Sequence, residues 1–133
     1  MQVETNEYGV EVYAGIEEFI AMNADNLKEW KQKNNNKPLY TIRHNLNKFG
    51  DVYVVVVQPT AMEYDTIRMA VLGDKESLDK AYNLLYSKLI VYPDKDKFAA
   101  LYRQHAQYGL VHAIINQIGL QLGYTGDTVS KEV

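Results

Sequence analysis

The clearest pattern in the chain is a run of apolar residues that ends at a proline and precedes two amphipathic stretches. Residues 52 to 57 are valines and one tyrosine, bounded by Gly50-Asp51 and Pro59, which predicts a β-strand. Alternation puts Tyr53, Val55 and Val57 on one face and the even-numbered valines on the other. Because neither face is polar, we expect an interior strand that is covered on both sides.

Two helices are predicted after this strand. Residues Thr60 to Glu63 fit a capping box, in which the threonine side chain and the glutamate three residues later bond each other's backbone amides. Helical spacing then gives an inner face of Tyr64, Ile67 and Val71, with Gly73 at the end. A second helix opens at residues 74 to 76, and apolar residues recur every three or four positions until Pro93 breaks it. These residues are Leu78, Ala81, Tyr82, Leu85, Leu89 and Tyr92.

The N-terminal third predicts a short hairpin or an ordered arm, and then a helix. Residues 1 to 13 alternate weakly around a possible turn at residues 6 to 9. From Gly15 onward one helical face is apolar, and the helix is interrupted near Asn23 or Asp25, where it can restart. This face comprises Ile16, Phe19, Ile20, Leu27 and Trp30.

An outer strand is expected next, over residues 39 to 44. Its half-alternating pattern suits an edge position, and it should pair antiparallel with residues 52 to 58.

The C-terminal part predicts two more helices. Asp94 is placed to cap a helix over residues 95 to 106, with Phe98, Leu101 and Tyr102 facing inward. The last helix carries a wide apolar stripe, whereas His112, Asn116, Gln117 and Gln121 take its other side. The stripe comprises Leu110, Val111, Ile114, Ile115, Ile118 and Leu122. Residues 124 to 133 form a polar tail, which we expect to be mobile.

These elements predict an α+β fold. We expect a small antiparallel β-hairpin or sheet packed against four to five α-helices, with the C-terminal half all helical. The chain of 133 residues is long enough for one domain, so residues 1–133 are predicted to form a single domain.

Composition narrows the functional classes. The net charge is −3 with acidic and basic residues interspersed, so the basic field that nucleic-acid binding needs is missing. No apolar run approaches the roughly 20 residues that cross a bilayer, and the acidic, polar N-terminus is unlike a secretory signal. The absence of cysteine excludes disulfides and thiol catalysis. Eleven tyrosines suit half-buried positions and protein interfaces, although a tyrosine-rich genome would produce the same count.

The sequence predicts no catalytic residue, no cofactor site and no metal site. The glycines are scattered, so no phosphate-binding loop is present. The three histidines, His44, His105 and His112, fall in different predicted elements without acidic residues at metal-ligand spacing. Tyr64 and Arg68 are four residues apart, and two readings stay open for them: stacking on a helix surface, or a small anion-binding pair.

Four segments together resemble a known family. They are LKEWKQKN at 27 to 34, VYVVVVQPTAMEYDTI at 52 to 67, DKAYNLLYSKLIVYPDKDKF at 79 to 98, and LGY at 122 to 124. In their order and in the strand-Pro-helix step, residues 27 to 133 resemble the tail assembly chaperones of tailed bacteriophages of Bacteroidota and Firmicutes. Gln58 stands where family members often have a basic residue, and the first 25 residues have no counterpart.

The resemblance implies a non-enzymatic protein of the host bacterial cytoplasm. Such chaperones coat the long tape measure protein and recruit tail tube subunits as the tail grows. The partner surface that we predict lies around Ile114, Ile118, Leu122 and Tyr124; the alternative is that the three aliphatic residues belong to the core.

Other functions stay open from the sequence alone. One alternative is another phage-encoded binding protein, either a minor virion component or a factor that sequesters a small molecule. That function predicts a pocket lined by tyrosines and an arginine such as Arg43, Arg68 or Arg103. An enzyme would instead place His105 or His112 beside a carboxylate and a tyrosine in a cleft. A strand apolar on both faces also makes a homo-oligomer possible.

Overall fold

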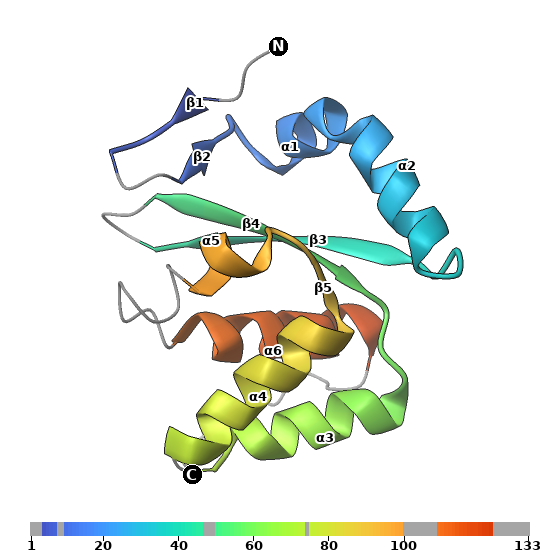
Figure 1. Cartoon of the computed structure of the whole chain (residues 1–133), viewed down its shortest axis with the longest axis vertical. Coiled ribbons are helices and arrows are strands. Elements are labelled where there is room, and N and C mark those ends of the chain that lie inside the picture. The colour runs from blue at the N-terminus through green and yellow to red at the C-terminus, as the bar shows by residue number, and fades with distance from the viewer. Residues whose placement is uncertain (1–3, 8–9, 47–49, 74, 100–108, 124–133) are drawn as a thin grey trace, which may run out of the picture.

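The computed structural model describes residues 4–7, 10–46, 50–73, 75–99 and 109–123, and these form the predicted α+β fold. A two-stranded sheet and a three-stranded sheet are combined with helices that lie on both faces of the larger sheet (Figure 1). In chain order the elements are β1 (Glu4–Thr5), β2 (Glu11–Val12), α1 (Ile16–Met22), α2 (Ala24–Lys33), β3 (Leu39–Asn45), β4 (Asp51–Val57), α3 (Ala61–Val71), α4 (Lys75–Lys88), β5 (Ile90–Tyr92), α5 (Lys95–Ala99) and α6 (Gly109–Leu122).

The N-terminal residues form a hairpin, one of the two predicted alternatives, followed by the predicted interrupted helix. β1 and β2 pair antiparallel, with Thr5 opposite Glu11. The break between α1 and α2 falls at Asn23, whose buried side chain donates to the Phe19 carbonyl at 2.9 Å. Because a buried amide must be hydrogen bonded, this contact fixes the join of the two helices. Ile16 and Ile20 are exposed, so the prediction that they share the inner face is wrong; only Phe19 of α1 is buried.

The three-stranded sheet has the order β3-β4-β5, with both neighbours antiparallel to β4. β3 pairs with β4 along its whole length, from Leu39 opposite Val57 to Asn45 opposite Asp51. The predicted pairing and the predicted outer position of β3 are therefore confirmed. Asn35 and Asn36, with φ of 59° and 56°, make the turn that leads from α2 into β3.

β4 is the predicted interior strand, because each of its residues from 52 to 57 is buried. Tyr53 and Val55 pack with Tyr13 and Phe19, a cluster that we call the aromatic layer. The even-numbered valines pack with α3, α4 and α6 in a larger cluster that we call the aliphatic layer. Val57 also belongs to the aliphatic layer, against the alternation, because the register of β4 against β5 shifts between Val55 and Val56.

The prediction that the C-terminal half is all helical is wrong for one segment. α4 ends at Lys88, and residues 90 to 92 form β5 instead of a last helical turn. The Val57 amide donates to the Leu89 carbonyl at 2.9 Å, and Val55 lies opposite Tyr92. Residues 90 to 92 fit the helical spacing of α4, but they pair with the edge of β4 instead, because the backbone groups of a buried strand edge must be hydrogen bonded.

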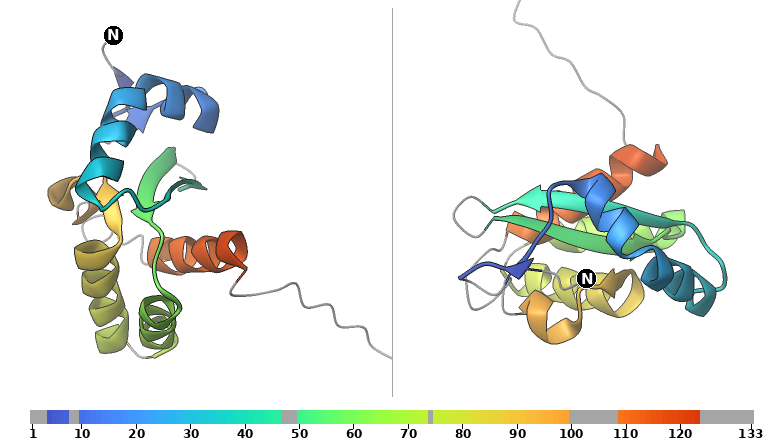
Figure 2. Two further views of the ribbon diagram at one scale, coloured as in Figure 1. Left: turned by 90° about the vertical axis from the view of Figure 1, so that its right-hand side faces the viewer. Right: turned by 90° about the horizontal axis from the view of Figure 1, so that it is seen from above.

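Helices α3, α4 and α6 cover the face of the sheet opposite α1 and α2, as Figure 2 shows from two further sides. α3 starts with the predicted capping box: Glu63 N–H donates to Thr60 Oγ1 at 3.1 Å, and Thr60 N–H donates to Glu63 Oε1 at 2.9 Å. Asp94 caps α5 through the Lys97 amide, and Phe98 is fully buried. Residues 100 to 106 of the predicted helix, and the tail from 124 to 133, lie outside the described residues. Within the described ranges no helix has the length and apolarity to cross a membrane.

Candidate protein-binding surface

The outer face of α3 exposes large apolar side chains. Tyr64, Ile67 and Val71 are buried on its inner side, as predicted. On the outer side Met62 is 80% exposed and Met69 58%, and Leu72, which directly follows the helix, is 67% exposed. Met62 and Met69 are seven residues apart, nearly two helical turns, so they lie on the same side of the helix. Unbranched methionine side chains adapt to different partner shapes, which is why such a face suits protein binding.

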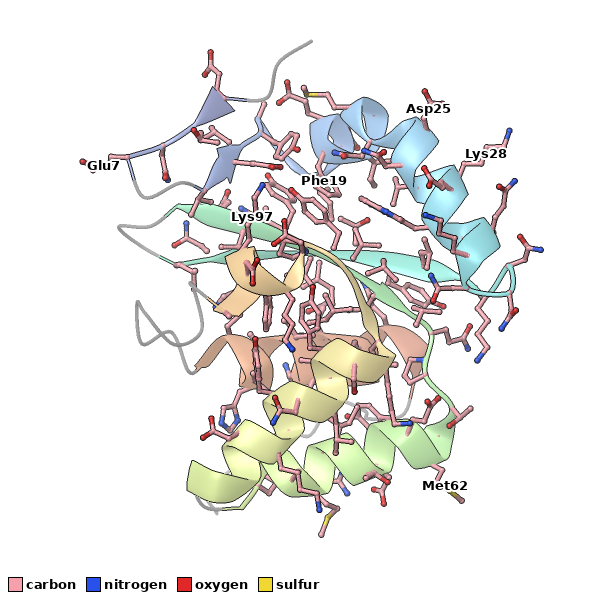
Figure 3. The ribbon with its side chains drawn as sticks, in the orientation of Figure 1. Glu7, Phe19, Asp25, Lys28, Met62 and Lys97 are labelled. Carbon is pink, nitrogen blue, oxygen red and sulfur yellow. The ribbon has the colours of Figure 1, made fainter. Side chains whose placement is uncertain are left out.

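A small groove lies beside this face, between α3 and α4. Its volume is about 210 Å³, and Met62 forms part of its wall. The full lining is Thr60, Met62, Glu63, Thr66, Ile67, Leu84 and Lys88. Pockets for small-molecule ligands usually measure about 300 to 1,000 Å³. The groove is therefore of a size for one or two side chains of a partner protein. Figure 3 shows Met62 pointing away from the ribbon at the start of α3.

The charges around the groove are largely compensated. Glu63 is engaged in the helix cap, and its backbone hydrogen bond with Thr60 lowers the pKa of Glu63 despite some burial. Lys37 and Lys88 lower it further through their positive charges. With Glu63 kept ionised and its charge offset, the groove offers an apolar floor of Leu84 and Ile67 with a lysine at the rim.

A second, larger groove of about 530 Å³ runs along α4 toward α5. Its lining is Asp79, Lys80, Tyr82, Asn83, Leu84, Tyr86, Ser87 and Lys95. The Tyr86 hydroxyl donates to the Pro93 carbonyl at 2.9 Å. Burial, together with Asp94, raises the pKa of Tyr86 to about 12, so this tyrosine stays protonated at neutral pH.

This groove meets the prediction for a small-molecule site only in part. Two tyrosines line it, but its cations are lysines and not the predicted arginines. Arg43 is paired with Asp51 at 3.1 Å, and Arg68 is paired with Asp65 at 3.2 Å. Arg103 lies outside the described residues.

A polar cluster centred on Glu11 links β2 to β5 and α5. The Glu11 carboxylate accepts hydrogen bonds from Tyr92, from Tyr13 at 3.0 Å and from Lys97 Nζ at 2.9 Å. Burial by itself raises the pKa of Glu11, but the three hydrogen bonds together outweigh it and leave the pKa below its ordinary value. Lys97 lies on the side of α5 toward the N-terminal strands (Figure 3). We interpret the cluster as stabilising the fold and not as a binding site, because each polar group in it already has a partner.

The structure corrects the predicted partner surface. Ile114 and Ile118 are 0% and 1% exposed and belong to the aliphatic layer, so the core alternative holds for both. A partner could reach them only by opening the core. Leu122 is the last residue of α6, and Tyr124 lies outside the described residues. The residues that sequence reasoning missed are Met62, Met69 and Leu72. The sequence did contain a pattern that could have identified them, because they are apolar residues that do not lie on the predicted inner face of α3.

The other residues considered as catalytic, metal-binding or anion-binding candidates do not come together in one site. His112 is exposed on α6, and burial lowers the pKa of the half-buried His44; His105 lies outside the described residues. Tyr64 is buried while Arg68 pairs with Asp65, so the two do not form an anion-binding pair. Within the described part of the chain, no three histidine or acidic residues gather where they could hold a metal ion.

Comparisons with known proteins add no assignment. Neither the models of protein families, nor the curated proteins, nor the solved structures include a match to this chain.

Proposed function

We propose that this chain is a non-enzymatic tail assembly chaperone that binds the tape measure protein through the outer face of α3 and the adjoining groove. The observation that carries the proposal is the exposure of Met62 and Met69 on one side of α3, with Leu72 also exposed directly after its last residue. The resemblance of residues 27 to 133 to phage tail assembly chaperones supplies the identity of the partner. The same resemblance assigns recruitment of tail tube subunits and a place in the host bacterial cytoplasm.

The shape of the surface supports a helical partner. A tape measure protein is long and helical, with apolar stripes that must be kept from aggregating. An amphipathic helix places apolar side chains at spacings of three, four and seven residues into a hydrophobic groove. The groove beside Met62 fits one or two such side chains, and the exposed methionines extend the contact along α3.

Co-expression with the tape measure protein of the same phage tests the proposal. The wild type should co-purify with it and raise its soluble yield. The double variant Met62→Glu/Met69→Glu should lose both effects, because it places two charges in the apolar contact. Ile20→Glu is the matched control, since Ile20 is 44% exposed but lies on α1 across the sheet. The proposal fails if the wild type does not co-purify, or if the double variant binds as the control does.

The groove of about 530 Å³ favours a second candidate function, the sequestration of a small anionic molecule. Lys80 and Lys95 supply positive charge, and Tyr82 and Tyr86 supply aromatic surface. A thermal-shift screen with nucleotides separates the two functions. A ligand at about 100 times its Kd should stabilise the protein by roughly 2.7 kcal/mol if this groove binds it, and Lys80→Ala should remove the shift. A chaperone shows no such response.

A further inference from the structure

We infer that this protein forms a two-fold dimer in which β3 pairs antiparallel with β3 of a second copy, while the outer faces of the two α6 helices meet beneath the joined sheets. The inference is independent of the proposed function, because it does not use the surface of α3. It rests on the backbone of β3 and on the composition of α6.

Within the described residues, the outer edge of β3 has backbone hydrogen-bonding groups without a backbone partner. Gln58 N–H donates to the Pro38 carbonyl, and Leu46 N–H donates to the Gly50 carbonyl, both at 2.9 Å. In the observed register, these bonds direct the backbone groups of the even-numbered residues of β3 toward β4. The groups of Leu39, Thr41 and Arg43 therefore point outward, where the described residues provide no backbone partner. An uncovered edge of this length is a template for another strand.

The helix that contacts this strand, α6, contains no acidic residue, lysine or arginine. The 14 residues of α6 contain no Asp, Glu, Lys or Arg, although these make up 23% of the whole chain. Its exposed side includes His112, Asn116 and Leu120, which are four residues apart and therefore lie in one line. Depletion of charged residues is typical of the centre of a protein interface, whereas a solvent-facing helix is normally charged.

The two features form one surface. α6 contacts β3, and Figure 2 shows α6 passing under the sheet and continuing beyond β3. A strand added to β3 would therefore lie above the outer turns of α6. A bare strand edge buries little area, and α6 supplies the further contact that a stable dimer needs.

A second copy is the occupant that this surface matches. An antiparallel strand edge can pair with an identical edge under two-fold symmetry. Two α6 helices can meet without burying a carboxylate, ammonium or guanidinium group, because α6 contains no Asp, Glu, Lys or Arg. The register centred on Ile42 uses all seven residues of β3 and places Thr41 opposite the partner's Arg43. A shift that places the two Arg43 residues opposite each other is disfavoured, because like charges directly across strands repel.

Single substitutions on the two elements test the dimer, with sedimentation velocity as the readout. Thr41→Pro removes one outward N–H from each copy and leaves the bonds to β4 intact, so the dimer Kd should rise about 100-fold. Thr41→Val keeps the N–H and should remain dimeric. Leu120→Glu should also give a monomer, whereas Leu72→Glu, at an exposed leucine that directly follows α3, should not. Far-UV circular dichroism establishes that each variant is folded.

Three results would overturn the inference. The first would be a wild type that sediments as a monomer up to high micromolar concentrations. The second would be a Thr41→Pro variant that is as dimeric as Thr41→Val, and the third a Leu120→Glu variant that is as dimeric as Leu72→Glu. Dimers in the wild type and in both controls, with folded monomers in both test variants, would establish it.

Discussion

The two layers that cover β4 are built in different ways. Within the described residues the aliphatic layer holds 21 buried residues and the aromatic layer four. The aliphatic layer consists mainly of aliphatic side chains, and within it the Tyr82 ring stacks on Phe98 at 5.5 Å. In the aromatic layer, the Phe19 ring stacks on Tyr53 at 4.9 Å, Tyr13 meets both rings edge-on, and Glu11 fastens the surrounding tyrosines. Because burial of apolar area dominates stability, the aliphatic layer should carry most of it.

Removing a buried side chain from the aliphatic layer should have the largest effect. Ile114→Ala deletes a fully buried side chain of α6 and leaves a cavity, so we expect a loss of about 3 to 4 kcal/mol in the free energy of unfolding. Urea denaturation measures it. Ile20→Ala, at an exposed position, is the control. A loss under about 1 kcal/mol would mean that the aliphatic layer is not the main core.

The Glu11→Gln substitution should have the next largest effect on the free energy of unfolding, and this effect should depend on pH. At neutral pH we expect a loss of about 2 kcal/mol, because charge-assisted hydrogen bonds to Lys97 and two tyrosines are weakened. The folded-state pKa of Glu11 is below its ordinary value of 4.5, so its stabilising effect is present above that pH and is lost as the pH falls through the lowered pKa.

Denaturation of wild type and variant from pH 7 to pH 3 checks this pH dependence. The two stability curves should converge at acid pH. Glu29→Gln is the control, because the pair of Glu29 with Lys33 is exposed and its loss should matter much less. Curves that stay parallel would show that the ionised Glu11 carboxylate does not fasten the aromatic layer.

Thr60→Ala should cost less, about 1 kcal/mol, through loss of the side-chain half of the α3 cap. The change tests whether polar contacts matter less in the aliphatic layer than Glu11 does in the aromatic one. Chemical denaturation is again the measurement, and Thr60→Ser, which retains the hydroxyl, should behave as wild type. A cost above that of Glu11→Gln would reverse the comparison.

Tyr53→Phe should have the smallest effect, and its sign is opposite. The Tyr53 hydroxyl is buried and has no hydrogen-bond partner within the described part of the chain. Its removal ends a desolvation cost, so stability should stay unchanged or rise by up to about 1 kcal/mol. Thermal unfolding measures this; a clear fall in the melting temperature would point to a hydrogen bond of that hydroxyl in solution.

The two layers also differ in how far the sequence predicts them. The valine run, the capping box of Thr60 and the apolar stripe of α6 are local patterns, and all three appear in the structure. β5 was missed because Leu89 and Tyr92 continue the helical spacing of α4, while the free edge of β4 decides their structure. Glu11 is separated from Tyr92 by 81 positions in the chain and from Lys97 by 86, so no local sequence pattern could predict these contacts.

The candidate site shows the same limit. An apolar stripe such as that of Ile114 and Ile118 predicts burial and partner binding equally well, because both need an apolar surface. Only the packing of α6 against α3 and β3 separates the two. Met62 and Met69, unlike Ile114 and Ile118, remain exposed, because other residues occupy the inner face of α3.

Native-state hydrogen exchange tests the unequal layers most directly. Amides of α1 and α2, such as those of Phe19 and Leu27, should open at a lower free energy than those of Val54 and Val56 in β4, because fewer buried side chains hold them. Stepwise addition of denaturant should therefore release the N-terminal helices first. If both groups of amides exchange with one and the same free energy of opening, the separation into a stronger and a weaker layer is wrong.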